Sequence, residues 1–538
     1  MDQSLVGEVQ AWITDDPDPS TASQLQQWLD TNNEAELRAS FNGFLQFGTA
    51  GLRGPIRPGP SGMNRAVVGR TAAGIVAYMK ERNLTSVIIG RDARHGSEDY
   101  TFETAEIMSG AGMKVFVLPR PLPTPVLAFA TNELGCDVGI MVTASHNPPQ
   151  DNGYKVYLGG TVDGIEYRGS QIVSPTDVSI AHKIAGITSL KQQPRGKEWT
   201  VLGEEIIEKY IDRTASLATK PGSLRIVYTA MHGVGTETLQ RVFQKAGFAS
   251  PILVEAQAAP DPDFPTVAFP NPEEPGAIDL ALETARSFDA DLVIANDPDA
   301  DRCAAAVKDP VTGWRMLRGD ELGAILGESI ARKTSTGIFA NSIVSSSILK
   351  KIAEHYQLDF KETLTGFKWL AKIKGLTFGY EEALGYAVDA KTVNDKDGIS
   401  AAITLAQIAT DLAADGKTLL DLLDEIWARH GFHATEQISI RLSDLSKVGV
   451  ILGGIRNNPP LNIAGRVVTS IDDLAAPTDG LPPTDGLRIW LDGGVRIIIR
   501  PSGTEAKMKC YIEVIEKDSK TAQVVLDQLR PPLKELLS

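Results

Sequence analysis

The residues of this chain that are best placed to do chemistry lie in one short stretch, TASHNPP at residues 143–149. The apolar run 136–142 predicts a buried strand before it, and paired prolines, which cannot continue a helix or donate to a sheet ladder, follow it. This leaves Ser145 on a stiff turn, with His146 beside it and Lys155 ten residues further on. Such a hydroxyl can serve as a nucleophile or a phosphate carrier. A serine that only shapes a local turn is the simpler alternative.

Three carboxylates at alternate positions, Asp297, Asp299 and Asp301, follow the apolar run 291–296. Pro298 disfavours a helix, so we expect an extended loop in which the three side chains converge. Converging carboxylates repel one another unless a cation neutralises them, and their hard oxygen atoms suit Mg²⁺ or Mn²⁺. The pattern therefore favours a divalent metal site, with a capped, solvated acidic turn as the alternative.

Arg302 follows this acidic triplet directly and argues against a calcium loop of the helix–loop–helix type. It stands where that loop needs its turn glycine, and Lys308 stands where the loop needs a bidentate glutamate. Beside metal ligands, Arg302 is instead suited to holding a phosphoryl oxygen that the metal also contacts.

Two glycine-rich stretches could contact a ligand. FGTAGLRG at residues 47–54 lets the backbone approach closely and adds Arg53, which can pair with phosphate, although a plain glycine turn fits equally well. GYEEALGY at residues 379–386 presents Glu381 and Glu382, a pair that can bind sugar hydroxyls. Taken alone, the pair is more typical of a solvated turn.

Two later stretches carry further charge. NDKDG at residues 394–398 places Lys396 between two acids, which is more typical of a surface salt bridge. RPSGTEAK at residues 500–507 follows a predicted strand and combines Arg500 with hydroxyls and backbone amides around a glycine. These groups predict an anion cradle, with a hairpin turn as the alternative.

Composition narrows the class of protein. At 538 residues the chain is long enough for about three or four domains, and 42% hydrophobic and 22% charged residues are ordinary for a globular protein. A net charge of −15 argues against a nucleic-acid partner, so an anionic substrate needs a local basic pocket. The three cysteines lack CxxC spacing, which predicts neither disulfides nor zinc and fits a reducing cytoplasm. The polar beginning predicts no signal peptide, and the absence of a long apolar run predicts no membrane partner.

A unit of strand, polar loop, helix and strand recurs along the chain, with first strands near 86–90, 224–228 and 337–340. Three such units predict three similar doubly wound α/β domains, although this rhythm is common to all α/β folds. The last hundred or so residues read as antiparallel strands with one face covered, which predicts a smaller C-terminal α+β domain. We place the domains at residues 1–205, which include a helical N-terminal arm, 206–318, 319–435 and 436–538.

Five of these stretches together resemble the phosphoglucomutase/phosphomannomutase family, the α-D-phosphohexomutases. FGTAGLRG, TASHNPPQDNGYK, DPDADR, GYEEALGY and RPSGTEAK occur in that family's order and at about its spacing, from Phe47 to Lys507. The resemblance implies three α/β domains and a smaller C-terminal domain around a central cleft. It also implies an intramolecular phosphotransferase that works through a phosphoserine and a bisphosphorylated sugar.

The resemblance assigns roles to residues that match the family's motifs. It implies that Mg²⁺ is held by Ser145, Asp297, Asp299 and Asp301. The catalytic groups that it implies are Ser145 as phosphoryl carrier, His146 and Lys396 as proton-transfer groups, and Arg53 and Arg302 near the phosphoserine. The substrate-binding residues that we expect are Lys155, Gly366, Lys368, Glu381, Glu382, Arg500, Ser502, Gly503 and Thr504.

Departures from the family pattern bear on the substrate. Pro298 and Ala300 replace glycines that many members carry between the metal aspartates. Ala383 stands where the family's sugar loop usually has a serine, which weakens the case for strict glucose preference. With the N-terminal arm and the GFKW stretch at residues 366–369, the chain resembles most the branch of phosphopentomutases and glucose-1,6-bisphosphate synthases.

The sequence therefore predicts a cytoplasmic phosphosugar mutase, a monomer or homodimer, that interconverts a sugar 1-phosphate with its 6- or 5-phosphate. Glucose 1-phosphate and glucose 6-phosphate are the expected pair, with Mg²⁺ as cofactor and glucose 1,6-bisphosphate as primer. Phosphopentomutase, phosphomannomutase and glucose-1,6-bisphosphate synthase activities are the alternatives. A Mg²⁺-dependent sugar phosphatase and a catalytically silent sugar-phosphate binder are the remaining hypotheses.

Overall fold

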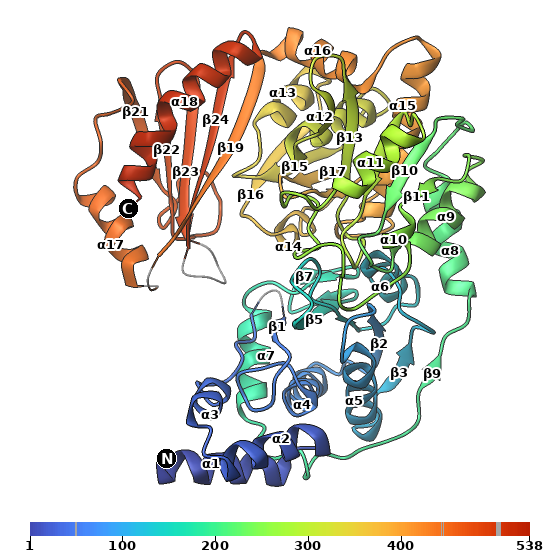
Figure 1. The fold of residues 1–538 in the computed structure, drawn as a ribbon, viewed down its shortest axis with the longest axis vertical. Helices are drawn as coiled ribbons and strands as arrows, with labels where there is room; N and C mark the ends of the chain where they lie inside the picture. Colours follow the sequence, from blue (N-terminus) through green and yellow to red (C-terminus); the bar gives the residue numbers. More distant parts are fainter. Residues whose placement is uncertain (49–50, 443, 445, 502–506, 538) are drawn as a thin grey trace. The chain divides into compact units, whose positions relative to one another are not determined.

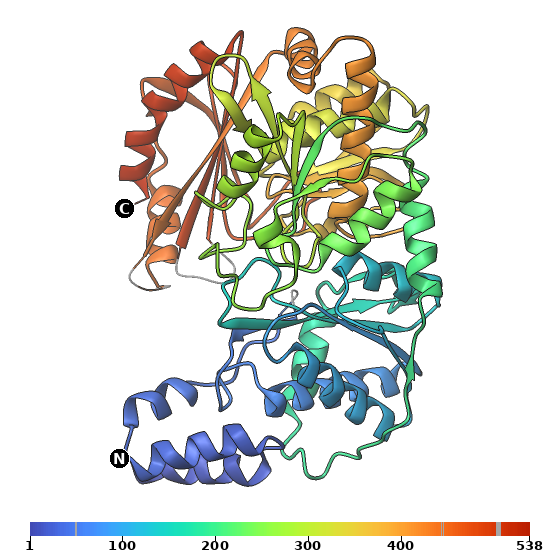
Figure 2. The ribbon, with the colours of Figure 1, turned by 45° about the vertical axis from the view of Figure 1, so that its right-hand side comes forward.

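The computed structural model describes residues 1–48, 51–442, 444, 446–501 and 507–537 (Figures 1 and 2). Contacts divide the chain into two compact units. The first unit comprises Met1–Leu317, Ala371–Lys374 and Ala383–Asp411, and the second comprises Arg318–Leu370, Gly375–Glu382 and Leu412–Ser538. Within the described residues, none of the helices combines the length and hydropathy that a membrane span requires.

The first unit begins with the helical arm that the sequence predicts. Its helices are α1 (Gln3–Asp15), α2 (Pro19–Asp30) and α3 (Glu34–Ser40). Asp2 and Asp18 cap the first two, each accepting a hydrogen bond from a backbone N–H of the first turn. Leu25 and Leu37 are fully buried, so the arm packs by its apolar face.

A mixed sheet in the order β1-β5-β4-β2-β3-β9, with β8 beside β5, forms the first α/β layer. Its centre is parallel, β4-β2-β3, and β5 joins β4 in the antiparallel sense. The helices α5 and α6 contact the central strands, and α4 contacts α5 and α7. The bounds are β1 (Leu52–Pro55), β2 (Ser86–Arg91), β3 (Lys114–Val117), β4 (Val138–Val142), β5 (Asp151–Leu158), β8 (Ser170–Gln171), β9 (Thr200–Val201), α4 (Arg65–Glu81), α5 (Ser97–Gly110), α6 (Thr124–Glu133) and α7 (Thr176–Ala185), with a small hairpin of β6 (Thr161–Val162) and β7 (Ile165–Glu166).

A second sheet in the same unit has the order β11-β10-β12-β13-β14. Its first three strands are parallel and its last two pairings antiparallel. The bounds are β10 (Ile226–Thr229), β11 (Ile252–Leu253), β12 (Leu292–Ala295), β13 (Ala304–Asp309), β14 (Gly313–Met316), α8 (Glu205–Ala215), α9 (Gly235–Lys245), α10 (Glu255–Ala258) and α11 (Asp279–Ser287); β18 (Gly385–Ala387) and most of α15 (Gly398–Ala414) also belong to this unit.

The second unit contains a third α/β layer, in which β15 pairs in parallel with β16 and β17. The first strands predicted for the three repeats correspond to β2, β10 and β15, so the expected three α/β layers are confirmed. The bounds are β15 (Ile338–Ser342), β16 (Asp359–Thr363), β17 (Leu376–Glu381), α12 (Gly319–Ala331), α13 (Ile348–His355), α14 (Phe367–Leu370) and α16 (Leu419–His430).

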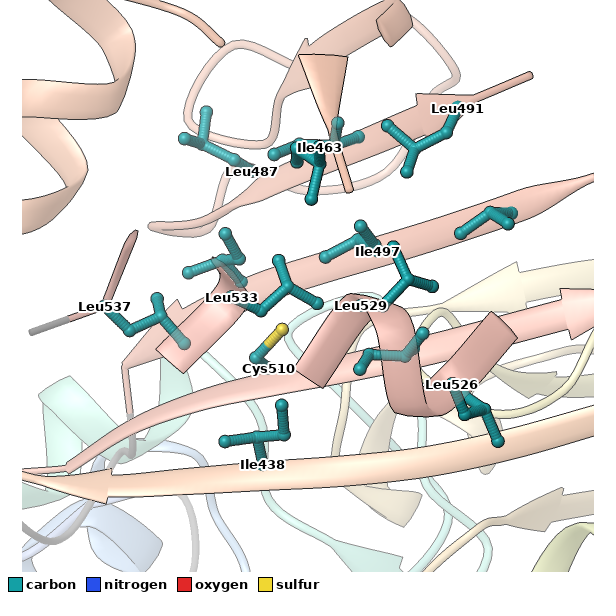
Figure 3. Close-up of a cluster of buried hydrophobic side chains, with 14 of the residues drawn as sticks. Ile438, Ile463, Leu487, Leu491, Ile497, Cys510, Leu526, Leu529, Leu533 and Leu537 are labelled. Carbon is teal, nitrogen blue, oxygen red and sulfur yellow. The ribbon is translucent and has the colours of Figure 1, made fainter. Parts of the chain in front are cut away.

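The C-terminal α+β layer is an antiparallel sheet in the order β19-β24-β23-β22-β21-β20, as the sequence predicts. Figure 3 shows Leu526, Leu529 and Leu533 of α18 packed over the strands that carry Ile438, Ile497 and Cys510. The bounds are β19 (Phe432–Arg441), β20 (Asn462–Ile463), β21 (Arg466–Asp473), β22 (Leu487–Leu491), β23 (Val495–Pro501), β24 (Lys507–Glu516), α17 (Ser446–Asn457) and α18 (Ser519–Leu536).

Strand β23 differs from the expected pattern of one covered face. Its residues are buried on both sides, since Ile498 packs with Ile343 and Val344 from the loop after β15. Arg496 on the same face is 4% exposed and forms an ion pair with Glu513 of β24. A buried ion pair of this kind keeps the charged residues in an alternating pattern, which explains why the sequence suggests a solvated face.

Candidate active site

The Ser145 loop connects β4 to β5 at the carboxyl end of the fully buried β4. Ser145 has a left-handed φ of 52°, its backbone N–H donates to the Thr143 hydroxyl at 2.9 Å, and the residue as a whole is 3% exposed. A non-glycine residue in this region is uncommon and is held there by its surroundings. The stiff turn that the sequence predicts is therefore present.

Arg94, in the loop after β2, supplies part of that restraint. Its guanidinium donates to four backbone carbonyls of the Ser145 loop and its end, those of Ser145 (2.6 Å), Asn147 (2.7 Å), Pro148 (2.9 Å) and Asp151 (3.2 Å). Because β2 and β4 are parallel neighbours, both loops leave the same edge of the sheet, which is where ligands bind in such folds.

The acidic triplet lies between β12 and β13, and its loop is a turn instead of the extended segment that we expected. The Ala300 N–H donates to the Asp297 carbonyl at 2.8 Å, and Ala300 has a φ of 54°. The turn still brings the three carboxylates together, because one oxygen from each lies within 4.8 Å of the others. All three residues are fully buried.

Ser145 and the acidic triplet meet although they are about 150 residues apart. The Ser145 hydroxyl donates to Asp297 Oδ2 at 2.8 Å, and the Arg302 backbone N–H donates to Asp297 Oδ1 at 3.0 Å. Thr124 at the start of α6 donates through its hydroxyl to Asp299 Oδ2 at 2.5 Å. The contact between a hydroxyl and the proposed metal ligands is thus made within one unit of the chain.

Two lysines surround the same acids. Lys155 Nζ lies 2.6 Å from Asp299 Oδ2 and 2.8 Å from Asp301 Oδ2, and Lys396 Nζ lies 3.2 Å from Asp301 Oδ2. Burial alone would lower the pKa of Lys155, but Asp299 and Asp301 raise it above its usual value. Lys396 is 13% exposed and contacts the acidic triplet, so it is not the surface salt bridge that its flanking acids suggest.

Charge also shifts the pKa values of the acids. Burial, followed by repulsion from Asp299 and Asp301, raises the pKa of Asp297 well above its usual range. Burial would raise the pKa of Asp301 as well, but the positive charges of Lys155 and Lys396 hold it below its usual range. Repulsion between like charges therefore dominates at Asp297, whereas the two lysines compensate the negative charge of Asp301.

The arginines and the histidine lie at the Ser145 side of the site. Arg53 donates to the Asn147 side-chain carbonyl at 3.1 Å, and His146 Nδ1 lies 3.2 Å from the Ser145 hydroxyl oxygen. Burial, and then repulsion from Arg302 and Arg53, lowers the pKa of His146 well below its usual value. A neutral imidazole beside a hydroxyl can accept a proton.

The donor set fits a hard divalent cation. Asp299 Oδ1 and Asp301 Oδ1 are buried without a hydrogen-bond partner in the described part of the chain, while the second oxygen of each carboxylate is occupied. Buried carboxylate oxygens of this kind are suited to Mg²⁺ or Mn²⁺. The triplet is the one group of three or more acidic, histidine or cysteine side chains, within the part of the chain that the structure describes, whose ligand atoms lie close enough together to bind one metal ion.

The predicted substrate residues lie in the second unit, except Lys155. Glu381 at the end of β17 accepts a hydrogen bond from the Gly366 N–H at 2.6 Å, so these two predicted residues are in contact. Lys368 lies two residues after Gly366, in the short α14, and Arg500 lies near the end of β23. Ser502, Gly503 and Thr504 lie outside the described residues.

Glu382 is placed differently from its neighbour. Its Oε2 accepts hydrogen bonds from the hydroxyls of Ser342 and Ser345, each at 3.0 Å. Burial, followed by repulsion from Glu381, raises its pKa. Glu382 therefore bonds the end of β15 and the loop after it, and Glu381 bonds the loop after β16; no local sequence pattern indicates the two serine partners.

Three residues near the Ser145 end escape the sequence-based prediction. They are Arg94, Asn147 and Thr124, whose side chains bond the Ser145 loop, Arg53 and Asp299. The position of Arg94 after a buried strand was a usable signal, since the carboxyl ends of parallel strands share an edge. Thr124, in Pro123-Thr124-Pro125, shows only the signal of a helix start.

By its matches to known families and relatives, the chain is a multidomain α/β phosphosugar mutase, an enzyme of the intramolecular phosphotransferase class. The chain belongs to the phosphoglucomutase/phosphomannomutase family. The family's alpha/beta/alpha domains I, II and III match residues 45–174, 208–313 and 318–430, and its C-terminal domain matches residues 457–529. The resemblance inferred from the sequence motifs is thereby confirmed.

Individual relatives carry different substrate names. The chain is 47% identical to a "Probable phosphomannomutase" of Haemophilus influenzae, over 88% of this chain and 98% of the relative. It is 33% identical to a phosphopentomutase of Mus musculus (99% and 95% covered) and 32% identical to a phosphoglucomutase of Staphylococcus haemolyticus (91% and 94%). The class of reaction is common to all three, and the sugar is not.

Solved structures share the fold. A phosphoglucomutase/phosphomannomutase family protein from Burkholderia thailandensis has a TM-score of 0.70 at 20% identity, with 91% of this chain and 97% of that chain covered. The open form of a Paramecium phosphoglucomutase, parafusin, has a TM-score of 0.69 at 19% identity, with 92% and 94% covered.

Proposed function

We propose that this enzyme interconverts glucose 1-phosphate and glucose 6-phosphate through a phosphoryl group carried on Ser145 and a bisphosphorylated sugar intermediate. The observation that carries the proposal is the buried contact of the Ser145 hydroxyl with Asp297 Oδ2 at 2.8 Å, beside two further carboxylates. A hydroxyl in this position is restrained, shielded from water and adjacent to a site suited to a divalent cation.

The chain's own residues divide the work in this proposal. Phosphoserine 145 gives its phosphoryl to a sugar hydroxyl, and His146 or Lys396 takes the proton from that hydroxyl. Arg302 and Arg53 offset negative charge at the phosphoryl oxygens. Mg²⁺ bound by Ser145, Asp297, Asp299 and Asp301 would supply Lewis-acid stabilisation of the same charge.

Two phosphate-binding regions explain why the sugar can turn end for end between the two transfers. We propose that Arg500, with Ser502, Gly503 and Thr504, holds the phosphate that does not react. Substrate contacts from Lys155, Gly366, Lys368, Glu381 and Glu382 complete the assignment. Glucose 1,6-bisphosphate primes the enzyme by phosphorylating Ser145. A cytoplasmic location is part of the same proposal, and the three free, buried cysteines support it.

The sugar is the open part of this proposal. Ala383 leaves the sugar loop without the hydroxyl found there in many family members, and the relatives named phosphopentomutase and phosphomannomutase supply the alternatives. Glucose-1,6-bisphosphate synthase activity would require that the bisphosphate leaves before the second transfer and that another phosphoryl donor phosphorylates Ser145 again.

A panel of glucose, mannose and ribose 1-phosphates with Mg²⁺ and glucose 1,6-bisphosphate tests the proposal. We expect isomerised monophosphate from the parent enzyme and none from Ser145→Ala, with Ser216→Ala as the control, since the Ser216 hydroxyl donates to the Arg213 carbonyl at the end of α8. Release of inorganic phosphate in place of isomer would identify a phosphatase. Binding without turnover, unchanged in Ser145→Ala, would identify a silent binder.

A further inference from the structure

Lys155 projects from the middle of β5 into the acidic triplet. Its strand pairs with β4 on one side and β1 on the other, and Lys155 lies opposite Met141 in the β4 register. The side chain is only 6% exposed, and its ammonium lies within 2.8 Å of oxygens of both Asp299 and Asp301. Because β5 is paired on both sides, the position of the Lys155 backbone, and with it the reach of its ammonium group, is fixed by the sheet.

The lysine contacts are arranged so that one oxygen of each carboxylate stays available. Asp299 Oδ2 accepts from Lys155 and Thr124, and Asp301 Oδ2 accepts from Lys155 and lies near Lys396. Both Oδ1 atoms are buried without a hydrogen-bond partner in the described part of the chain. The Lys155 ammonium and a divalent cation therefore need not compete for the same oxygen atoms, although both would contact the carboxylates of Asp299 and Asp301.

We propose that Lys155 is a built-in counter-cation that lowers the affinity of the Asp297–Asp301 triplet for divalent cations and stabilises the chain when no metal is bound. The inference rests on the metal site of the proposed function and adds what sets the strength of that site.

The direction follows from the charges. Three buried carboxylates repel one another strongly, and the ammonium groups of Lys155 and Lys396 offset part of their negative charge at Asp299 and Asp301. What remains to attract a divalent cation is correspondingly small, and the ammonium also repels that cation directly. A lysine that only oriented the carboxylates would act in the opposite direction, because loss of an orienting partner weakens metal binding by about 10–100-fold.

The test is a Mn²⁺ titration of the full chain, read by the electron paramagnetic resonance signal of free Mn²⁺, on protein shown by intact mass to carry no phosphate. We expect Lys155→Gln to bind Mn²⁺ at least about tenfold more tightly than the parent and Lys155→Arg, which keeps the charge, to bind within about threefold of it. Lys372→Gln is the matched control, since this partly buried lysine bonds the Ser170 hydroxyl and the Gln171 carbonyl and contacts none of the triplet.

Equal or weaker Mn²⁺ binding by Lys155→Gln would overturn the inference while leaving the metal site intact. Absence of Mn²⁺ binding by the parent and all variants would overturn the metal site itself and the inference with it. If Lys155→Gln does not fold without metal, competition of the Mn²⁺-loaded variant against a chelator gives its affinity directly. Its thermal midpoint should also rise more on addition of Mn²⁺ than that of the parent.

Discussion

At the level of single residues, the carboxylates of the acidic triplet are held in place by the buried groups that surround them. Asp299 is fully buried, its Oδ2 accepts hydrogen bonds from Lys155 and Thr124, and its Oδ1 has no hydrogen-bond partner among the residues that the structure describes. We predict that Asp299→Asn lowers kcat by at least about 100-fold, because the amide keeps the shape but loses the charge. Steady-state assays at saturating Mg²⁺ measure this, with circular dichroism to verify folding. Asp359→Asn, on the exposed start of β16, is the control, and turnover near the parent value in Asp299→Asn would remove the triplet from the mechanism.

Much of the candidate site could be predicted from the types of its residues. Alternating aspartates after an apolar run indicate that positive charge lies among them, because like charges converge only when they are compensated, and this is independent of the loop's shape. The loop's actual turn, with Ala300 at a φ of 54°, was not predictable since nothing in DPDADR marks a left-handed alanine. Lys396 shows the limit of the local pattern, because its flanking acids suggest a surface pair, whereas the family resemblance names it as a proton-transfer group and the fold places it beside Asp301.

At the scale of elements, the loops at the carboxyl edge of the first sheet act together. Arg94 in one loop bonds the carbonyls of the Ser145 loop, and its planar fork serves several acceptors at once. We predict that Arg94→Lys slows transfer of phosphate from glucose 1,6-bisphosphate to Ser145 by about 10–100-fold, because a misplaced nucleophile loses most of its advantage. Radiolabel incorporation into Ser145 measures the rate, with Arg91→Lys in the preceding strand as the control. Labelling at the parent rate would assign Arg94 a purely structural role.

A second element-scale prediction concerns Asp320 at the start of α12. It accepts hydrogen bonds from the Ser346 N–H, the Tyr380 hydroxyl and the Thr435 hydroxyl, and burial raises its pKa to about 6. A carboxyl with a raised folded-state pKa binds more protons in the fold, so its contribution to stability is present below about pH 4 and is lost as the pH rises to about 6.

Asp320→Asn should therefore gain stability relative to the parent as the pH rises from about 4 to 7, by up to about 3 kcal/mol. Denaturant midpoints of the two proteins across this range measure the difference. A constant difference between Asp320→Asn and the parent would contradict the assigned pKa.

Elements were predicted well where their pattern is local and less well where packing comes from afar. The buried β4 and the repeated first strands β2, β10 and β15 follow from apolar runs alone. The second buried face of β23 depends on Ile343 and Val344, more than 150 residues away, and no local pattern contains that information. The partners of Glu382, Ser342 and Ser345, are missing from the prediction for the same reason.

At the level of the whole molecule, the chain carries all four domains of the phosphoglucomutase/phosphomannomutase family. We predict turnover of both glucose 1-phosphate and ribose 1-phosphate, because Ala383 removes a sugar contact, with inorganic phosphate released in fewer than about one in a hundred turnovers. Coupled assays and a phosphate assay on the same samples measure both quantities. Strict hexose specificity would contradict the role given to Ala383, and stoichiometric phosphate release would contradict the mutase assignment.

The central claim is that Ser145 and the acidic triplet bind one divalent cation between them. The direct measurement is anomalous scattering at the manganese edge from crystals of the enzyme equilibrated with Mn²⁺. We expect one peak bonded to the Ser145 hydroxyl oxygen, or to a phosphoryl oxygen on it, and to Asp297, Asp299 and Asp301. Crystals saturated with Mn²⁺ that give no peak at the triplet, or a peak there out of reach of Ser145, would contradict it.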